Sequence, residues 1–207
     1  MRADLALVAG LVPPGSRVLD LGCGDGSLLD HLARARRCRV QGAERSPDAV
    51  VACLRRGIPV VELDVDSGLT DFGDGAFDVV VLSQTLQALH RPRDVLREVV
   101  RVGRVGIVSF PNFGHWAIRL RLLVAGRMPS SRTLPHAWYD TPNIHLCTVA
   151  DFEALARAEG LVVRERRLLD AAGRAATGLV GRRPNLLAAG AAYVVERGAA
   201  GAEPAET

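Results

Sequence analysis

Three glycines alternate with other residues in the segment VLDLGCGDG, directly after a short apolar run. Glycines at this density allow a tight turn of the backbone and let a ligand approach it closely. Carboxylates surround the turn, on both sides of its first glycines and at the ends of the next two apolar runs. These residues are Gly22, Gly24, Gly26, Asp20, Asp25, Glu44 and Asp64. The spacing predicts a ligand-binding turn surrounded by negative charge.

The charges indicate which ligand suits the turn. A dinucleotide-binding fold places a pyrophosphate there with Gly-x-Gly-x-x-Gly spacing, but here the third glycine comes one residue early and Ser27 stands in its usual place. Four carboxylates would repel a pyrophosphate, and a low dielectric strengthens that repulsion. They suit a cationic amino group and a sulfonium, both present in S-adenosylmethionine (SAM), and Glu44 suits its ribose diol. The alternative is that the acids are solvated loop ends.

Alternating strand and helix patterns must position this turn. The run FDVVVL is typical of a strand buried on both faces of a parallel sheet. Helices are predicted at Asp25–Arg36, between Ser46 and Gly57, at Pro92–Arg101 and between Thr148 and Gly160. Strands are predicted at Arg17–Leu21, Arg39–Glu44, Ile58–Asp64, Phe77–Leu82, Val105–Phe110, Leu161–Leu169 and Leu186–Val195. This order predicts an α/β fold with a single doubly wound, mostly parallel sheet of seven strands.

The alternation lapses in one internal segment. Residues from about 111 to 147 contain both tryptophans and form a small aromatic-rich insertion after the fifth strand. The chain of 207 residues is 48% hydrophobic, enough to bury one core. We therefore expect one domain over residues 1–197, followed by a disordered tail at 198–207.

Composition excludes several classes of protein. All 26 basic residues are arginine, which excludes P-loop kinases, Schiff-base aldolases and pyridoxal-phosphate enzymes, because these need a lysine. The four cysteines form no CxxC pair, as expected for a reduced cytoplasmic protein without a metal site. A net charge of +3 does not suggest nucleic-acid binding. No apolar run approaches the ~18 residues that cross a bilayer, and MRADLALVAGLVPPG is predicted to be an amphipathic helix rather than a signal peptide.

VLDLGCGDG, followed by an acid at the end of the second strand, resembles the cofactor signature of class I SAM-dependent methyltransferases, which have a Rossmann-like fold. The resemblance implies that Glu44 binds the ribose hydroxyls of SAM or S-adenosylhomocysteine (SAH). It places Asp20 near the amino group, and Asp64 with the backbone of Val65 by the adenine. The full cofactor site that it implies is Asp20, Gly22, Cys23, Gly24, Gly26, Glu44, Asp64, Val65 and Ser83.

Longer sequence segments indicate a particular family within this class. The segments DVVVLSQTLQALHRPRDVLREVVRVGR, VSFPNFGHW, GRMP and WYDTPNIHLCT are similar to the MetW family of methionine biosynthesis proteins, from about Arg17 to Val195. Members of that family accompany the homoserine O-acyltransferase MetX and are thought to support or activate it. The resemblance therefore implies a cytoplasmic role in making methionine, with MetX as the partner.

Catalysis would require an aligned acceptor and, for an acceptor that carries a proton, a base. The sequence lacks the Asn/Asp-Pro-Pro-aromatic motif of enzymes that methylate amino groups of nucleic acids. Candidate bases are His115, His145 and Tyr139, with His90 a weaker one, and each has a structural hydrogen-bonding role as its alternative. No base stands out, so whether the protein is an independent enzyme stays open.

The insertion is a second candidate functional region, which could bind a partner protein. Arginines and aromatics are enriched at binding hot spots, so Trp116, Arg119, Trp138 and Tyr139 are candidate partner-binding residues. The alternative is a lid over the sheet edge. Two hypotheses follow: an accessory protein that binds SAM and activates MetX, or a methyltransferase acting on an unidentified small molecule.

Overall fold

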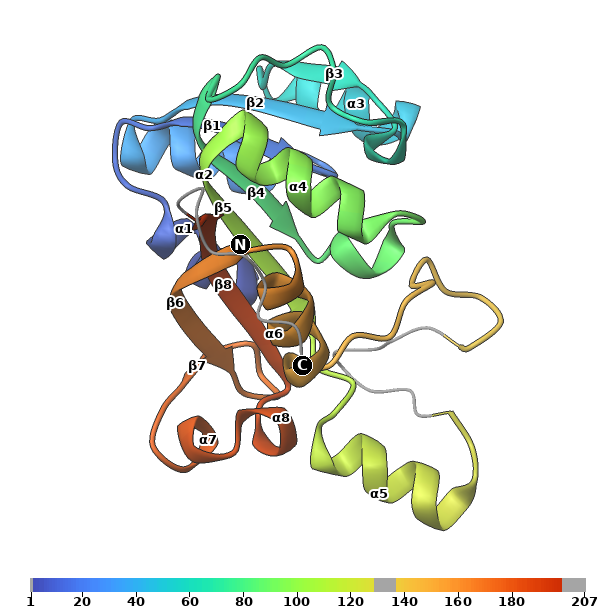
Figure 1. The fold of residues 1–207 in the computed structure, drawn as a ribbon. Coiled ribbons are helices and arrows are strands. Elements are labelled where there is room, and N and C mark those ends of the chain that lie inside the picture. The colour runs from blue at the N-terminus through green and yellow to red at the C-terminus, as the bar shows by residue number, and fades with distance from the viewer. Residues whose placement is uncertain (1, 129–136, 199–207) are drawn as a thin grey trace.

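The computed structural model describes residues 2–128 and 137–198, and this part of the chain is organised around one sheet of eight strands (Figure 1). The strand order is β3-β2-β1-β4-β5-β8-β6-β7. The strands are β1 Arg17–Leu21, β2 Arg39–Glu44, β3 Val60–Glu62, β4 Phe77–Ser83, β5 Gly103–Pro111, β6 Leu161–Leu169, β7 Ala175–Ala176 and β8 Gly190–Arg197. The helices are α1 Ala3–Leu11, α2 Ser27–Arg36, α3 Pro47–Arg55, α4 Pro92–Val102, α5 Trp116–Ala125, α6 Val149–Ala158, α7 Leu179–Arg182 and α8 Pro184–Leu187.

Strands β1 to β5 run parallel, and β8 lies antiparallel between β5 and β6. The carboxyl ends of β1 and its neighbours therefore meet at one edge of the sheet, where ligands bind in open α/β folds. The predicted α/β architecture with a doubly wound, mostly parallel sheet is confirmed.

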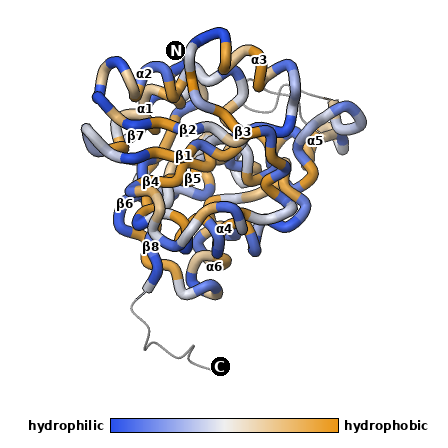
Figure 2. Tube along the Cα trace, turned by 90° about the horizontal axis from the view of Figure 1, so that it is seen from above, coloured by the Kyte–Doolittle hydropathy of each residue, from blue (hydrophilic) through white to orange (hydrophobic). Residues whose placement is uncertain are grey.

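Helices cover both faces of the sheet. The continuous apolar sequence of β4 fits this arrangement, because its side chains point to both faces. Val80 and Leu82 point into the core under α4 and α6, and Val79 and Val81 into the core under α1, α2 and α3. All four side chains are buried, as a strand covered on both faces requires. Figure 2 shows hydrophobic segments gathered in the central strands.

The prediction of seven strands was wrong by one. The additional strand, β7, pairs antiparallel with the end of β6. The Asp170 carboxylate accepts hydrogen bonds from the backbone N–H groups of Ala172 and Arg174, at 2.8 and 2.9 Å, and so closes a tight turn between the two strands. A strand of two residues is too short for its side-chain alternation to be read from the sequence.

The last strand was also placed too early. Leu186 and Leu187 belong to α8, which Pro184 begins, and β8 starts only at Gly190. Proline favours the first turn of a helix, because its missing N–H is not needed there. The apolar run was continuous across this boundary, so hydrophobicity alone could not separate the short helix from the strand.

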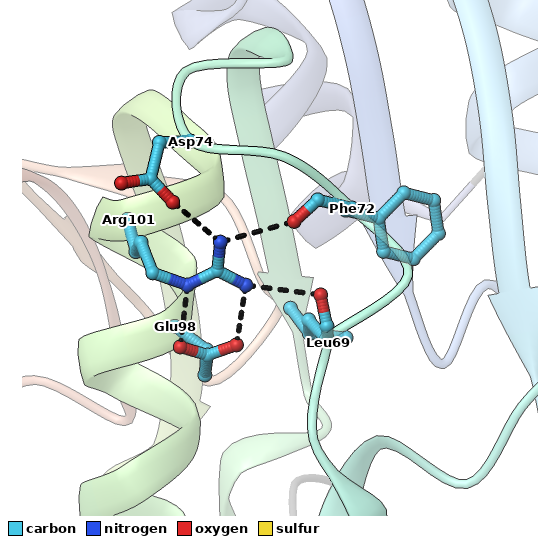
Figure 3. Close-up of polar contacts among 5 residues, drawn as sticks. All are labelled: Leu69, Phe72, Asp74, Glu98 and Arg101. Atoms are coloured by element: carbon cyan, nitrogen blue, oxygen red, sulfur yellow. Dashed lines mark hydrogen bonds and ion pairs between the residues drawn. The ribbon is translucent and has the colours of Figure 1, made fainter.

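One arginine fastens the loop between β3 and β4 to α4 (Figure 3). The Arg101 guanidinium donates to both carboxylate oxygens of Glu98, to the Asp74 carboxylate and to the carbonyls of Leu69 and Phe72, at 2.6 to 3.0 Å. Its planar fork reaches acceptors on three sides, which an ammonium group cannot match. The loop that follows the predicted adenine side of the site is thereby held in place.

Replacing Arg101 by lysine should lower the free energy of unfolding by about 2 kcal/mol, since the carbonyls of Leu69 and Phe72 lose their charged donor. Chemical denaturation measures this change. The matched control is Arg104→Lys, because Arg104 is 73% exposed and its ion pair with Asp78 is long, at 3.9 Å. Equal unfolding midpoints for both variants would contradict the role given to Arg101.

The insertion contains a helix, α5, that lies apart from the helices covering the sheet (Figure 1). Of its side chains only Ile118 is buried. Residues 129–136 of the insertion lie outside the described residues, and so does all of the predicted disordered tail except Gly198.

Candidate functional site

A cavity of about 660 Å³ opens at the carboxyl ends of β1 and β4. We call it the glycine-loop cavity. Its position, beyond the ends of central parallel strands, is the expected ligand site of this architecture. It is lined by Arg2, Leu5, Asp20, Gly22, Cys23, Gly24, Asp25, Ser27, Leu28, Ser83 and Gln84. Five of the nine predicted cofactor residues are among them: Asp20, Gly22, Cys23, Gly24 and Ser83.

The glycines of the turn adopt the left-handed conformation that other residues rarely take. Their φ values are +71° at Gly22, +55° at Gly24 and +74° at Gly26. A Cβ on Gly22 would lie 2.8 Å from the side chain of Thr85, whose hydroxyl donates to the carbonyl of Leu21. A Cβ on Gly24 would meet no atom within 4 Å. The backbone at Gly24 is therefore open to a ligand, while Gly22 is packed against the loop after β4.

Asp20 is a buried carboxyl group in the wall of the cavity, with 3% of the residue exposed. Burial raises its pKa to about 8, and the nearby charge of Glu44 acts in the same direction. Among the described residues, no cationic side chain offsets these effects. Ionising such a carboxyl group by itself costs free energy. With a cation beside it, the group ionises and becomes a strong hydrogen-bond acceptor.

Glu44 reaches the turn from the end of β2. Its Oε2 accepts from the backbone N–H of Gly24 at 2.9 Å, and its Oε1 accepts from those of Arg45 and Ser46 at 2.8 and 2.9 Å. A carboxylate can accept about four hydrogen bonds, so capacity for a further donor remains. The contact with Gly24 brings Glu44 to the glycine loop even though it does not line the cavity itself.

The remaining acids of the turn and the remaining predicted cofactor residues are farther from the cavity or have partners of their own. Asp25 lines it but pairs with Arg56 at 2.7 Å. Asp64 caps a 3-10 helix by accepting from the N–H of Asp66, and Val65 is buried in that helix. Gly26 begins α2. The structure thus brings Asp20 and Glu44 together at the turn, and leaves Asp64 and Val65 outside the cavity.

Sequence reasoning missed Arg2 and Gln84, which both line the glycine-loop cavity. Arg2 precedes α1, far from the glycine turn in sequence, and no local pattern marks it. Gln84 follows β4 and has a positive φ of +57°, which is uncommon for a residue other than glycine. Its position directly after a buried strand was the only sequence signal available.

The structure also brings together two cysteines that lie 30 positions apart. The Sγ atoms of Cys23 and Cys53 are 3.7 Å from each other, and the Cys53 thiol donates to the carbonyl of Gly24 at 3.2 Å. Burial raises the pKa of both thiols. They therefore pack under the turn as small apolar groups and are not reactive thiolates.

The polar groups of the cavity complement those of SAM. The buried Asp20 carboxyl, the unobstructed backbone of Gly24, the Glu44 carboxylate at the edge and the Arg2 guanidinium complement an ammonium, a diol and a carboxylate. Within residues 2–128 and 137–198, no cluster of three or more His, Cys, Asp or Glu side chains could hold a metal ion. In the same residues, no helix has the length and apolar character needed to cross a membrane.

Affinity for SAH should rise with pH, by up to tenfold per unit between about pH 5.5 and 7, where the amino group of the ligand keeps its proton. Below its pKa of about 8 Asp20 is protonated in the free protein, and an ammonium bound beside it releases that proton. Raising the pH therefore favours binding. Calorimetry over this range measures the slope, which should disappear in Asp20→Asn. A pH-independent affinity in the unmodified protein would contradict the assignment.

The candidate bases are not gathered at this cavity. His115 caps α5, its Nδ1 accepting from the N–H of Ala117, and burial lowers its pKa. His145 lines a separate small cavity, beside Phe113, and Tyr139 is 77% exposed. None of the three lines the glycine-loop cavity.

The predicted partner-binding residues are exposed at the surface of the insertion. Trp116, Trp138 and Tyr139 are exposed, at 49%, 73% and 77%, and the last two contact each other edge to face. Arg119 donates to the carbonyl of Gly114 and so fastens the start of α5. These residues lie in the insertion, away from the residues that line the glycine-loop cavity.

A family model described as methionine biosynthesis protein MetW matches residues 2–195. The bifunctional methionine biosynthesis protein MetXA/MetW of Rhodopirellula baltica is 35% identical over 179 residues, which is 82% of this chain and 29% of that protein. The chain thus spans less than a third of the length of this relative.

Solved structures with the same fold include methyltransferases. A SAM-dependent methyltransferase from Mesorhizobium loti matches with a TM-score of 0.68 and 18% identity, over 94% of this chain and 98% of that one. Magnesium protoporphyrin IX methyltransferase from Synechocystis PCC 6803, solved with bound SAH, matches with a TM-score of 0.61 and 18% identity, over 94% and 80%. At this identity the likeness shows the fold, which is that of class I SAM-dependent methyltransferases.

Proposed function

The chain belongs to the MetW family of methionine biosynthesis proteins, and from this premise we propose that it is an accessory protein of the homoserine O-acyltransferase MetX. In this proposal it acts in the cytoplasm, binds SAM in the glycine-loop cavity, and associates with and activates MetX. The observation that carries it is the Rhodopirellula baltica relative, whose name joins MetXA and MetW in one protein. Fusion keeps two modules at a high effective concentration, which is useful where they work together.

SAM binding is supported by the buried Asp20 carboxyl, by Glu44 at the turn and by the open backbone at Gly24. The ligand contributes an ammonium beside Asp20 and a diol that donates to Glu44. SAM is also a downstream product of the methionine pathway, so its binding would report methionine sufficiency. A regulatory effect requires SAM to bind the free and the partner-bound protein with different affinity.

Partner binding is supported by one face of α5. Trp116, Leu120, Leu123 and Val124 follow the spacing i, i+4, i+7, i+8 and form a stripe on one side of the helix. They are 49%, 50%, 84% and 76% exposed, while Ile118 on the opposite side is 4% exposed and anchors the helix. We call this stripe the α5 face. Helices present such stripes to apolar grooves of partner proteins.

The alternative is a methyltransferase acting on a small molecule. The fold is compatible with it, because one scaffold can host catalysis or binding alone. Against it stands the position of His115, His145 and Tyr139, none of which lines the glycine-loop cavity. An acceptor that carries a proton would find no base among them at the methyl group.

The test is the rate of homoserine acylation by the cognate MetX, measured alone, with this protein, and with this protein plus SAM. We expect a large rise on adding the protein and a further change, in either direction, on adding SAM. Co-elution in size-exclusion chromatography measures the association independently. No rise together with no co-elution would contradict the proposal. Steady production of SAH with an added small-molecule acceptor would favour the alternative.

A further inference from the structure

A second cavity, of about 420 Å³, adjoins the glycine-loop cavity. We call it the adjoining cavity. Arg2 and Gln84 line both cavities, so the two share a wall. The adjoining cavity is lined by Arg2, Ala3, Asp4, Gln84, Gln87, Pro111, Pro142, Asn143, Leu169, Asp170, Ala171, Ala172, Gly173, Ala189 and Gly190. Its volume is in the range of pockets that hold small molecules.

Hydrogen bonds hold the walls of the adjoining cavity in place. The backbone carbonyl of Gln87 accepts from the N–H groups of Ile144 and His145, at 2.8 and 2.9 Å, and so fixes the segment that carries Asn143. The turn between β6 and β7 is closed by the Asp170 carboxylate. Six separate segments of the chain therefore form a built pocket next to the predicted SAM site.

The charges that line the adjoining cavity are balanced. Arg2 pairs with Asp4 through Nε and Nη2, at 3.1 and 2.6 Å, and Asp170 pairs with Arg174 at 3.1 Å. A ligand with a net charge would meet no unpaired counter-charge there. A zwitterion would meet both signs, because its carboxylate can lie against the Arg2 guanidinium and its ammonium against the Asp4 or Asp170 carboxylate.

The remaining polar lining consists of carboxamides, which donate and accept hydrogen bonds. Gln87 is 5% exposed, and its Nε2 donates to the carbonyl of Gln84 at 2.8 Å. Its Oε1 is buried without a hydrogen-bond partner among the described residues. A buried acceptor left unpaired costs roughly 1–3 kcal/mol. A donor on a bound molecule, met by a small rotation of the carboxamide, would satisfy it.

We propose that the adjoining cavity binds a zwitterionic amino acid with a polar side chain, at the same time as the glycine-loop cavity holds its own ligand. This inference rests on the proposed function for the identity of the neighbouring ligand and for the choice of the probe. L-Homoserine is the probe, because it carries an ammonium, a carboxylate and a hydroxyl donor and is the amino acid that the proposed partner acylates. Simultaneous binding would let one protein report two small molecules of the same pathway.

The experiment is saturation-transfer NMR with L-homoserine, on protein that is first saturated with SAH. We expect homoserine to bind with SAH present. Displacement of homoserine by SAH would overturn the inference, because homoserine would then occupy the part of the glycine-loop cavity that holds the amino-acid portion of SAH. Absence of homoserine binding to the free and the SAH-bound protein would overturn it as well.

Ala172→Trp fills the adjoining cavity from an exposed loop and should weaken homoserine binding at least tenfold, with SAH affinity unchanged. The matched control is Ala158→Trp, at an exposed position on α6 that lines neither cavity. Equal homoserine binding by the two variants would overturn the inference. SAH affinity and MetX activation are measured separately on each variant, so failure of the proposed function is distinguishable from failure of this site.

Discussion

The double substitution Leu120→Asp and Leu123→Asp should weaken the complex with MetX about 100-fold and abolish most of the activation. The two side chains are 50% and 84% exposed in the free protein, so their apolar surface is available to a partner. Two charges placed in the desolvated centre of an interface cost about 3 kcal/mol or more, since such centres hold the hot-spot residues. Titration calorimetry gives the dissociation constant, and the acylation assay gives the activation.

The fold should tolerate this double substitution, because neither residue belongs to the two buried cores. Its thermal midpoint should stay within a few degrees of that of the unmodified protein. The matched control is Leu54→Asp on α3, a helix that lies at the opposite end of the molecule from α5 in Figure 1; Leu54 is 58% exposed. If the double variant binds and activates MetX as well as this control does, the α5 face is not the docking surface.

Glu44→Gln should reduce SAH affinity about 100-fold. A hydrogen bond to a charged acceptor contributes roughly 1.5–3 kcal/mol, and a ribose hydroxyl would donate one to this carboxylate, which already accepts three from backbone N–H groups. The carboxamide keeps the size of the side chain and one acceptor oxygen, so it can still accept from the N–H of Gly24. Calorimetric titration with SAH measures the loss of affinity.

The chain provides a matched control for this substitution in the same sheet. Glu62 pairs in register with Glu44 on the neighbouring strand and is exposed at the surface. Glu62→Gln should therefore leave SAH affinity unchanged. Retention of full affinity in Glu44→Gln would contradict the ribose-binding role, and an unfolding midpoint well below that of the control would assign the loss to stability.

Much of the fold could be predicted because its strands are strongly apolar and its turns carry recognisable signals. The bounds of β1, β2 and β6 agree with the prediction to the residue. The Thr148 capping box forms as its spacing indicates. The short strand β7 and the onset of β8 were missed. The first depends on hydrogen bonds that the Asp170 carboxylate accepts, and the second on a proline that begins a short helix just before the apolar run.

The candidate site could be predicted only in its local part. Glycine spacing and strand-end acids are sequence features, and they led to Asp20, Gly24 and Glu44. The adjoining cavity could not be predicted, because its walls come from segments as far apart as Arg2 and Gly190. Distances of this kind are set by the whole topology of the sheet and leave no local pattern.

The position of β8 between β5 and β6 has a consequence for how the protein is made. A ribosome releases β5 and β6 well before β8, so for that interval each presents an unpaired strand edge. Exposed strand edges invite pairing with other chains, and the edge of β5 belongs to a strand whose residues are mostly buried in the folded protein. Newly made chains should therefore depend on chaperones until residues 190–197 emerge. Cells with reduced chaperone activity should accumulate less soluble protein.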